Sequence, residues 1–325
     1  MKHPATRRRW LRLGIRLLGP LLLAVVVLKI GDPEQLWESL KNARLGSLLA
    51  AVLLILPVIH LKVERWRMLL RARGHRYPLT RAYQAFLASV YLGMLTPGRV
   101  GDALRVQYLR HDMDMPYSEG LAISVMDRLC DVYGLLAFVA FGVAHFATVL
   151  TGQVMAIAWA SMAVIALSPL VLLLPGLAER LMGRIYGRIA RDPERRGLGR
   201  FLEALRSLVG KTLLVTVPLT VASFLCNYAQ GWLASGSLGL GLSFVDVMSM
   251  LAVTSLLGLM PISIAGVGVR ELVLALLFPA LGLAASQGVA FGLVVFAVLY
   301  LTPVLLGFVA WQIAPPPIEL QDKQR

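Results

Sequence analysis

The chain has 325 residues, of which 58% are hydrophobic, and its mean hydropathy is +0.72. Too few polar residues remain to cover a soluble globule, so the composition excludes a soluble enzyme and predicts a protein that lies in a lipid bilayer. A spanning structure must satisfy its backbone hydrogen bonds internally, which leaves helical bundles and closed barrels. The long apolar runs do not alternate with polar residues, so we predict an all-α, polytopic integral membrane bundle.

The basic residues, which give a net charge of +14, lie in blocks beside the apolar runs. Such blocks are typical of cytoplasmic loops in membrane proteins rather than of nucleic-acid binding. We therefore predict a multi-pass protein of the bacterial inner membrane, with a cytoplasmic N-terminus and cytoplasmic basic loops at about residues 62–81 and 176–211. We expect a single transmembrane domain over residues 1–314 and a short cytoplasmic tail over residues 315–325.

The first predicted span covers residues 15–30. The arginines before it are typical of a signal peptide, but no small-residue cleavage site follows, so we expect this helix to be retained. Residues 32–44 are predicted to lie on the far interface, and residues 45–61 form the second predicted span.

The next apolar segment, residues 83–95, is too short to cross about 30 Å of hydrocarbon at about 1.5 Å per residue. A Thr-Pro-Gly sequence ends it, so we predict a broken or re-entrant helix. Further spans are predicted at residues 132–150, 154–174 and 213–234. The basic loop before the last of these has the apolar spacing of a helix that lies on anionic headgroups.

The pattern breaks again between residues 244 and 283, where short apolar pieces at 248–260 and 272–281 flank a stretch with proline and glycine. Two half-helices fit this pattern better than two full spans, and two tilted spans are the alternative. The last predicted span covers residues 287–313. Because two broken elements occur in one chain, we also consider a pseudo-symmetric repeat.

The two interrupted stretches are the candidate lipid-binding site. In transporters, paired broken helices mark the substrate site, because unwound turns free backbone groups and half-helix N-termini offer positive dipole ends. An anionic headgroup suits such a place. The alternative is a pair of ordinary loops at the membrane surface. The candidate residues are Pro97, Gly98, Arg99, Asp102 and Arg105 in the early stretch, and Pro261, Ser263, Gly266, Gly268, Arg270 and Glu271 in the late stretch.

A third charged cluster precedes the apolar run at residue 132. Asp127 and Asp131 are four residues apart, on one face of a helix, and Arg128 lies between them. Charges within a bilayer are costly unless they pair or face water. The alternative here is an ordinary charged helix entry. We predict that carboxylates hold the arginines in place and that the guanidinium forks bind a lipid phosphate. These phosphate ligands are Arg99, Arg105, Arg128 and Arg270.

The sequence predicts no catalytic residue, metal site or cofactor. Gly210-Lys211-Thr212 resembles the end of a phosphate-binding loop, but Leu205 stands where that motif needs glycine, so no ATPase is implied. His60 and His145 lie in apolar runs without a carboxylate at ligand spacing. We interpret both histidines as packed or interfacial residues.

Four motifs follow one another along the chain. They are Glu-Arg-Trp-Arg at 64–67, Pro-Gly-Arg-Val-Gly-Asp at 97–102, Asp-Arg at 127–128 with Asp131, and Gly-Val-Gly-Val-Arg-Glu at 266–271. Together they resemble the flippase-like transmembrane domain of lysylphosphatidylglycerol synthases over nearly the whole chain. The late motif is the most specific, although Ala265 stands where the family usually has glycine. In the two-domain synthases this membrane portion translocates the aminoacylated lipid that a separate domain makes.

The sequence after the last predicted span is too short for an aminoacyl-transfer domain, so we expect a stand-alone member that does not transfer lysine. The family also has bacterial members linked to hopanoids and archaeal members linked to glycosylation, so the resemblance does not imply one lipid.

We therefore predict a translocator for a phosphate-bearing lipid, either a phospholipid or a polyprenyl phosphate, that also contacts anionic headgroups at the cytoplasmic face and hydrolyses no ATP. One alternative is a non-transporting accessory protein that presents lipid to a glycosyltransferase or another lipid-modifying enzyme. Another is an intramembrane enzyme that uses Asp127 or Glu271 as an acid or base.

Overall fold

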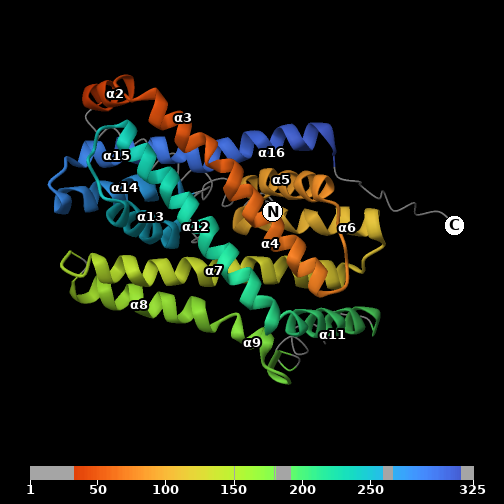
Figure 1. Ribbon diagram of the computed structural model, residues 1–325. Helices are drawn as coiled ribbons and strands as arrows, with labels where there is room; N and C mark the ends of the chain where they lie inside the picture. Colours follow the sequence, from red (N-terminus) through yellow and green to blue (C-terminus); the bar gives the residue numbers. More distant parts are fainter. Residues whose placement is uncertain (1–32, 150, 179, 181–191, 259–265, 316–325) are drawn as a thin grey trace, which may run out of the picture. The chain divides into compact units, whose positions relative to one another are not determined.

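The computed structural model describes residues 33–149, 151–178, 180, 192–258 and 266–315 (Figure 1). This part of the chain is helical and contains no strand. The first predicted span lies outside the described residues, as do residues 179 and 181–191 of the second basic loop, residues 316–325 of the tail, and Pro261 and Ser263.

Among the described residues, four stretches of helix are long and apolar enough to cross a membrane: Leu45–Ala72, Gly152–Leu173, Lys211–Ser237 and Ala285–Ile313. The first comprises α3 (Leu45–Leu53) and α4 (Ile55–Ala72). The second comprises α8 (Gly152–Leu167) and α9 (Leu170–Leu173), and the third is α12 (Lys211–Ser237). The last comprises α15 (Ala285–Val295), the π-helical segment η4 (Phe296–Leu301) and α16 (Thr302–Ile313). The predicted all-α, multi-pass membrane fold is confirmed.

The chain forms two compact units. Unit 1 takes its described residues from Met1–Val58, Leu135–Ala158 and Phe224–Pro303. Unit 2 takes them from Ile59–Gly134, Trp159–Ser223 and Val304–Arg325. The single transmembrane domain stays a prediction.

Unit 1 contains α2 (Pro33–Lys41), α13 (Phe244–Gly258), α14 (Val269–Leu277) and the short 3₁₀ segment η3 (Phe278–Leu281), together with α15 and η4. Helix α14 packs against α13 and α15, and α15 also contacts α2 (Figure 1). Helices α14 and α15 approach each other closely at Gly288, where an added Cβ would lie 2.8 Å from the Leu274 carbonyl oxygen.

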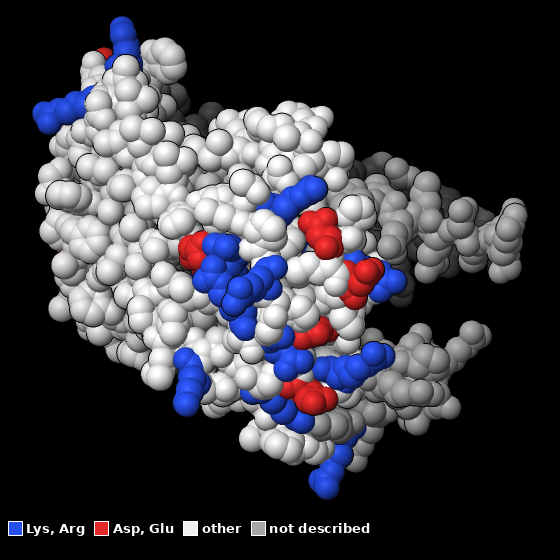
Figure 2. All heavy atoms as spheres, turned by 45° about the vertical axis from the view of Figure 1, so that its right-hand side comes forward, with Lys and Arg blue, Asp and Glu red and all other residues white. Residues whose placement is uncertain are grey.

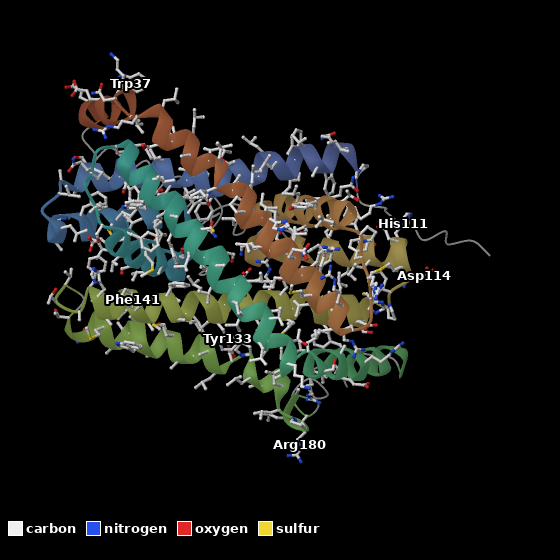
Figure 3. All side chains as sticks on the ribbon, in the orientation of Figure 1. Trp37, His111, Asp114, Tyr133, Phe141 and Arg180 are labelled. Atoms are coloured by element: carbon white, nitrogen blue, oxygen red, sulfur yellow. The ribbon has the colours of Figure 1, made fainter. Side chains whose placement is uncertain are left out.

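Unit 2 contains α5 (Leu79–Leu95), the 3₁₀ segment η1 (Pro97–Leu104), α6 (Arg105–Met113), the first part of α7 (Tyr117–His145) and α11 (Asp192–Ser207). Helix α5 packs along η1, and a Cβ at Gly101 would lie 2.4 Å from the Leu92 carbonyl carbon. Asp114, in the left-handed region with φ 51°, follows the end of α6 (Figure 3).

The predicted break after Leu95 has a local cause. The Thr96 hydroxyl donates to the Leu92 carbonyl at 2.8 Å and accepts the Gly101 amide at 2.8 Å. Pro97 then takes the first position of η1, where its missing N–H costs no hydrogen bond. The chain therefore leaves α5 in a tight 3₁₀ turn.

The helices that contain two of the predicted spans extend beyond one end of those spans. The second predicted span ends at residue 61, whereas α4 continues to Ala72. Helix α7 begins at Tyr117, well before the predicted start at residue 132. Farther along α7, the Tyr133 hydroxyl donates to the Ala166 carbonyl of α8 at 2.8 Å, within unit 2 (Figure 3).

Candidate functional site

Arg65 lies at the centre of a charged network in unit 2. Its side chain is 1% exposed, and its Nε donates to Asp127 Oδ1 at 2.9 Å. Its Nη1 donates to Asp131 Oδ1 at 2.8 Å and to the Thr220 hydroxyl at 3.1 Å. Its Nη2 donates to the Asp127 carbonyl at 3.2 Å. Arg65 on α4 therefore holds α7 and α12 through one guanidinium.

Three further cations share the network's carboxylates. Lys62 Nζ lies 2.9 Å from Asp131 Oδ1, and Arg128 Nη1 lies 3.1 Å from Asp131 Oδ2. Arg128 Nε also forms an ion pair with Asp102 at 3.1 Å, without hydrogen-bond geometry. The network thus joins four cations to three carboxylates, which leaves one formal positive charge. Its members are Lys62, Arg65, Asp102, Arg105, Asp127, Arg128 and Asp131.

Arg105 is fully buried where η1 passes into α6. Its Nη1 donates to Asp127 Oδ2 at 2.9 Å. The guanidinium carbon lies 5.3 Å from the Trp66 ring centroid and 5.0 Å from that of Phe86, within the range of cation–π attraction. Its Nη2 has no hydrogen-bond partner among the described residues. One donor of this buried guanidinium is therefore unused.

The second candidate site lies in unit 1 at the start of α14. Gly268, with φ 85°, takes the left-handed turn before the helix, and its N–H donates to Glu271 Oε2 at 2.6 Å. Glu271 Oε1 accepts Arg270 Nε at 3.1 Å and Nη2 at 2.5 Å. A Cβ at Gly292 would lie 2.9 Å from Glu271 Cγ. Glu271 therefore uses both oxygens to cap the helix and orient Arg270.

Arg270 is 3% exposed. Its guanidinium carbon lies 5.5 Å from the Phe296 centroid and 4.9 Å from that of Tyr300. Both rings come from the π-helical segment η4, an irregularity often found at functional sites. Arg270 Nη1 has no hydrogen-bond partner among the described residues. Arg270 and Arg105 thus have similar surroundings, because each guanidinium contacts one carboxylate and two aromatic rings. Each also has one nitrogen without a hydrogen-bond partner among the described residues.

The structure brings together many of the predicted site residues, but in two groups. Asp102, Arg105, Asp127, Arg128 and Asp131 meet in unit 2. Gly268, Arg270 and Glu271 meet in unit 1, and Gly266, with φ 75°, precedes them. Pro97, Gly98 and Arg99 lie in η1, but their side chains are outside the described part, and Pro261 and Ser263 are outside it altogether.

Sequence reasoning missed Lys62, Arg65 and Thr220. The signal for the first two was available, because they lie three residues apart on one face of a helix that continues from an apolar run. Their partners could not be found from the sequence, since Asp127 is 62 residues from Arg65. Thr220 lies in an apolar span, and nothing in the sequence around it indicates a site residue.

The structure gives His145, which we interpreted as a packed or interfacial residue, a carboxylate partner that lies far away in the sequence. Its Nε2 lies 2.8 Å from Asp246 Oδ1, and 101 residues separate the two, so local spacing could not reveal the pair. His60 instead contacts the Tyr83 hydroxyl at 2.7 Å. In the described part of the chain, no group of three His, Cys, Asp or Glu side chains is placed to hold a metal ion.

The basic segment after α4 lies in unit 2, beside the ends of α6 and α11. Figure 2 shows Lys and Arg side chains gathered on this face together with Asp and Glu. Arg73 Nε donates to Glu119 at 2.9 Å, and its Nη1 donates to Ser207 of α11 at 2.9 Å. The Tyr77 hydroxyl donates to Asp112 Oδ2 at 2.6 Å, and burial together with this hydrogen bond raises the pKa of Tyr77.

Comparison with known proteins identifies relatives. The protein named UPF0104 membrane protein MJ1595, from Methanocaldococcus jannaschii, is 25% identical over 285 residues, which cover 81% of this chain and 83% of the relative. Glycosyltransferase AglD from Haloferax volcanii is 30% identical over 142 residues, which cover 43% of this chain but only 22% of that protein.

The family model described as the lysylphosphatidylglycerol synthase TM region matches residues 13–307, so the match includes both broken elements and both candidate sites. The predicted resemblance is confirmed, and the chain belongs to the lysylphosphatidylglycerol synthase transmembrane-region family.

Proposed function

We propose that the protein moves a phosphate-bearing lipid across the cytoplasmic membrane without ATP hydrolysis. The observation that carries this proposal is Arg270, a buried guanidinium at a glycine-interrupted helix start, with one nitrogen that has no hydrogen-bond partner in the described part of the chain. A buried donor without a partner is costly, and an anionic oxygen would satisfy it. The family is a membrane domain related to lipid synthesis, so a lipid headgroup is the natural source of that oxygen.

The electrostatics of the site favour a phosphate. Arg270 is the second residue of α14, where the positive end of the helix dipole adds to its charge. Glu271 and the rings of Phe296 and Tyr300 fix the guanidinium, so little side-chain entropy remains to be lost on binding. Arg105 offers the same chemistry in unit 2. We propose both arginines as headgroup ligands, and the carboxylates as positioning residues.

The proposal extends to topology and energetics. The interrupted elements around Arg105 and Arg270 are re-entrant, and the N-terminus and basic loops are cytoplasmic. The lipid gradient, a coupled ion or the membrane potential drives transport, and the potential contributes about 2.3 kcal/mol per elementary charge per 100 mV. The protein catalyses no covalent step in this scheme.

The test is translocation of fluorescent lipids in liposomes that hold the purified protein. The panel contains zwitterionic, anionic, aminoacylated and polyprenyl-phosphate lipids. We compare wild type with Arg270→Ala and with Arg44→Ala, which removes an exposed arginine of the same unit. We expect wild type and the control to move one lipid class, and Arg270→Ala to move it at least tenfold more slowly. Equal rates for all three proteins would show that Arg270 is not a headgroup ligand.

A second candidate function is an accessory role in which the protein presents lipid to a glycosyltransferase. The observation that favours it is the similarity to Glycosyltransferase AglD, which covers 43% of this chain. Co-purification of a lipid-modifying enzyme in constant ratio, with no translocation of any lipid in the panel, would support this role over transport.

A further inference from the structure

Unit 2 contains a cavity of about 390 Å³ between the end of α4 and the turn that leads to α5. Its lining residues are Arg67, Arg71, Arg76 and Tyr77. Three of these four are cations, and none belongs to the charged network around Arg65. The cavity is therefore distinct from the charged network described above.

Two of the lining residues, Arg67 and Tyr77, are held by contacts within the protein. Arg67 Nε donates to the Tyr77 carbonyl at 3.0 Å, and Arg67 Nη1 pairs with Glu64. The Tyr77 ring packs edge-on against Trp66 with 5.8 Å between ring centroids, and its hydroxyl is held by Asp112. The shape of the cavity thus depends on contacts between its own walls.

The two exposed arginines of the lining carry the charge that is available to a ligand. Arg71 and Arg76 are exposed, and Arg71 Nη1 lies 3.9 Å from Glu64, too far for a hydrogen bond. Arg76 has no side-chain partner among the described residues. Arg67 is paired with Glu64, which leaves the positive charges of Arg71 and Arg76 for a phosphate monoester, whose charge is about −1.5 to −2 at neutral pH.

We propose that this cavity binds a phosphate group, with Arg71 and Arg76 as the donors and Arg67 held in place by the Tyr77 carbonyl and Glu64. The arginine fork matches phosphate geometry. The cavity lies at the end of the candidate span Leu45–Ala72, the depth at which lipid headgroups are found, so a lipid monoester is the favoured source. This inference does not rest on the proposed transport function.

The test measures binding to the purified full chain in a neutral detergent. The probes are short-chain phosphatidic acid, short-chain phosphatidylcholine and inorganic phosphate. The variant is Arg71→Gln with Arg76→Gln. The control is Arg180→Gln with Lys211→Gln, which removes the same charge from two exposed positions of unit 2 outside the cavity.

We expect the cavity variant to bind phosphatidic acid at least about tenfold more weakly than wild type, because two charge-assisted hydrogen bonds are lost. The control should stay within about twofold of wild type, and phosphatidylcholine should bind weakly to all three proteins. Competition by inorganic phosphate would show that a soluble phosphate is sufficient, whereas its failure to compete would assign the site to the lipid.

Equal binding of phosphatidic acid by the three proteins would overturn the proposal. The arginines would then only offset the partial negative charge at the C-terminal end of α4. If the double variant unfolds at a lower temperature than wild type, Arg76→Gln alone decides the question, because Arg76 is exposed and its side chain forms no hydrogen bond or ion pair with the described residues.

Discussion

Arg270 and Glu271 form an ion pair that is almost completely removed from solvent. Glu271 is fully buried, and its carboxylate also accepts the Gly268 N–H. Removing one partner of a buried pair leaves an uncompensated charge and costs about 3–5 kcal/mol, whereas removing both charges is often close to neutral. Removing one charge of this pair should therefore destabilise the protein more than removing both, which is not expected for a solvent-exposed pair.

We predict that Arg270→Met and Glu271→Gln each lower the free energy of unfolding by about 3 kcal/mol, and that the double variant loses less than the sum of the two. Thermal unfolding in detergent, followed by tryptophan fluorescence, measures this coupling. Additive losses would mean that solvent reaches the pair and screens it.

The double variant also separates folding from function. It removes the proposed headgroup ligand while the ionic imbalance is relieved, so we expect a folded protein that does not move lipid. Wild-type translocation by this variant would contradict the role of Arg270.

At the residue scale, the sequence was informative where the partners are local. The i, i+4 spacing of Asp127 and Asp131 predicts a common helix face, and both carboxylates bind the one guanidinium of Arg65. The aromatic partners of Arg105 and Arg270 could not be predicted, because Phe86 and Phe296 come from other elements and carry no polar signal.

Helix breaks in this chain allow backbones to approach closely. At Gly101 a Cβ would lie 2.4 Å from the Leu92 carbonyl carbon and 2.6 Å from the Gly93 amide nitrogen. Both obstacles are backbone atoms of α5, so neither can move aside without shifting the helix. The broken element that presents Asp102 and Arg105 therefore depends on the missing side chain.

We predict that Gly101→Ala destabilises the protein by about 2 kcal/mol or more, in the range of overpacked cores. Gly197→Ala in α11 is the control, since nothing lies within 4 Å of its added Cβ, and alanine should there stabilise the helix by up to about 1 kcal/mol. Chemical unfolding of both variants in detergent gives the comparison. A stable Gly101→Ala protein would show that α5 and η1 can separate.

At the element scale, short apolar length and a Pro-Gly pair were sufficient to predict the break after Leu95. The π-helical segment was not predictable, because its Phe-Ala-Val-Leu-Tyr-Leu sequence also suits an α-helix. Helices α4 and α7 extend past the predicted spans into charged segments, where Lys62 of α4 pairs with Asp131 of α7. Hydropathy indicates only the apolar part of each helix.

At the scale of the whole molecule, the composition was sufficient to predict the fold class, whereas the tertiary contacts could not be predicted from the sequence. An apolar chain with basic blocks is sufficient to predict a multi-pass helical bundle, since backbone hydrogen bonding leaves few alternatives in lipid. The division into two compact units was not predicted, because it depends on contacts among segments far apart in sequence. Sequence periodicity indicates the apolar face of a single helix, but it does not show which helices pack together.

We predict the orientation of the molecule from an uneven distribution of basic residues about the candidate span Leu45–Ala72. Residues 33–44 hold two basic residues, Lys41 and Arg44, and two acidic residues. Residues 62–81 hold seven basic residues and one acidic residue. Because basic loops stay in the cytoplasm, the two ends of this span should lie on opposite sides of the membrane.

We test this with single cysteines at two exposed positions, Asn42→Cys and Thr80→Cys, in a chain whose Cys130 and Cys226 are alanine. A membrane-impermeant thiol reagent is added to intact cells and to lysed cells. We expect position 42 to react in both samples and position 80 only after lysis. The reverse pattern would invert the proposed orientation, and reaction of both positions in intact cells would show that the helix made of α3 and α4 does not cross the bilayer.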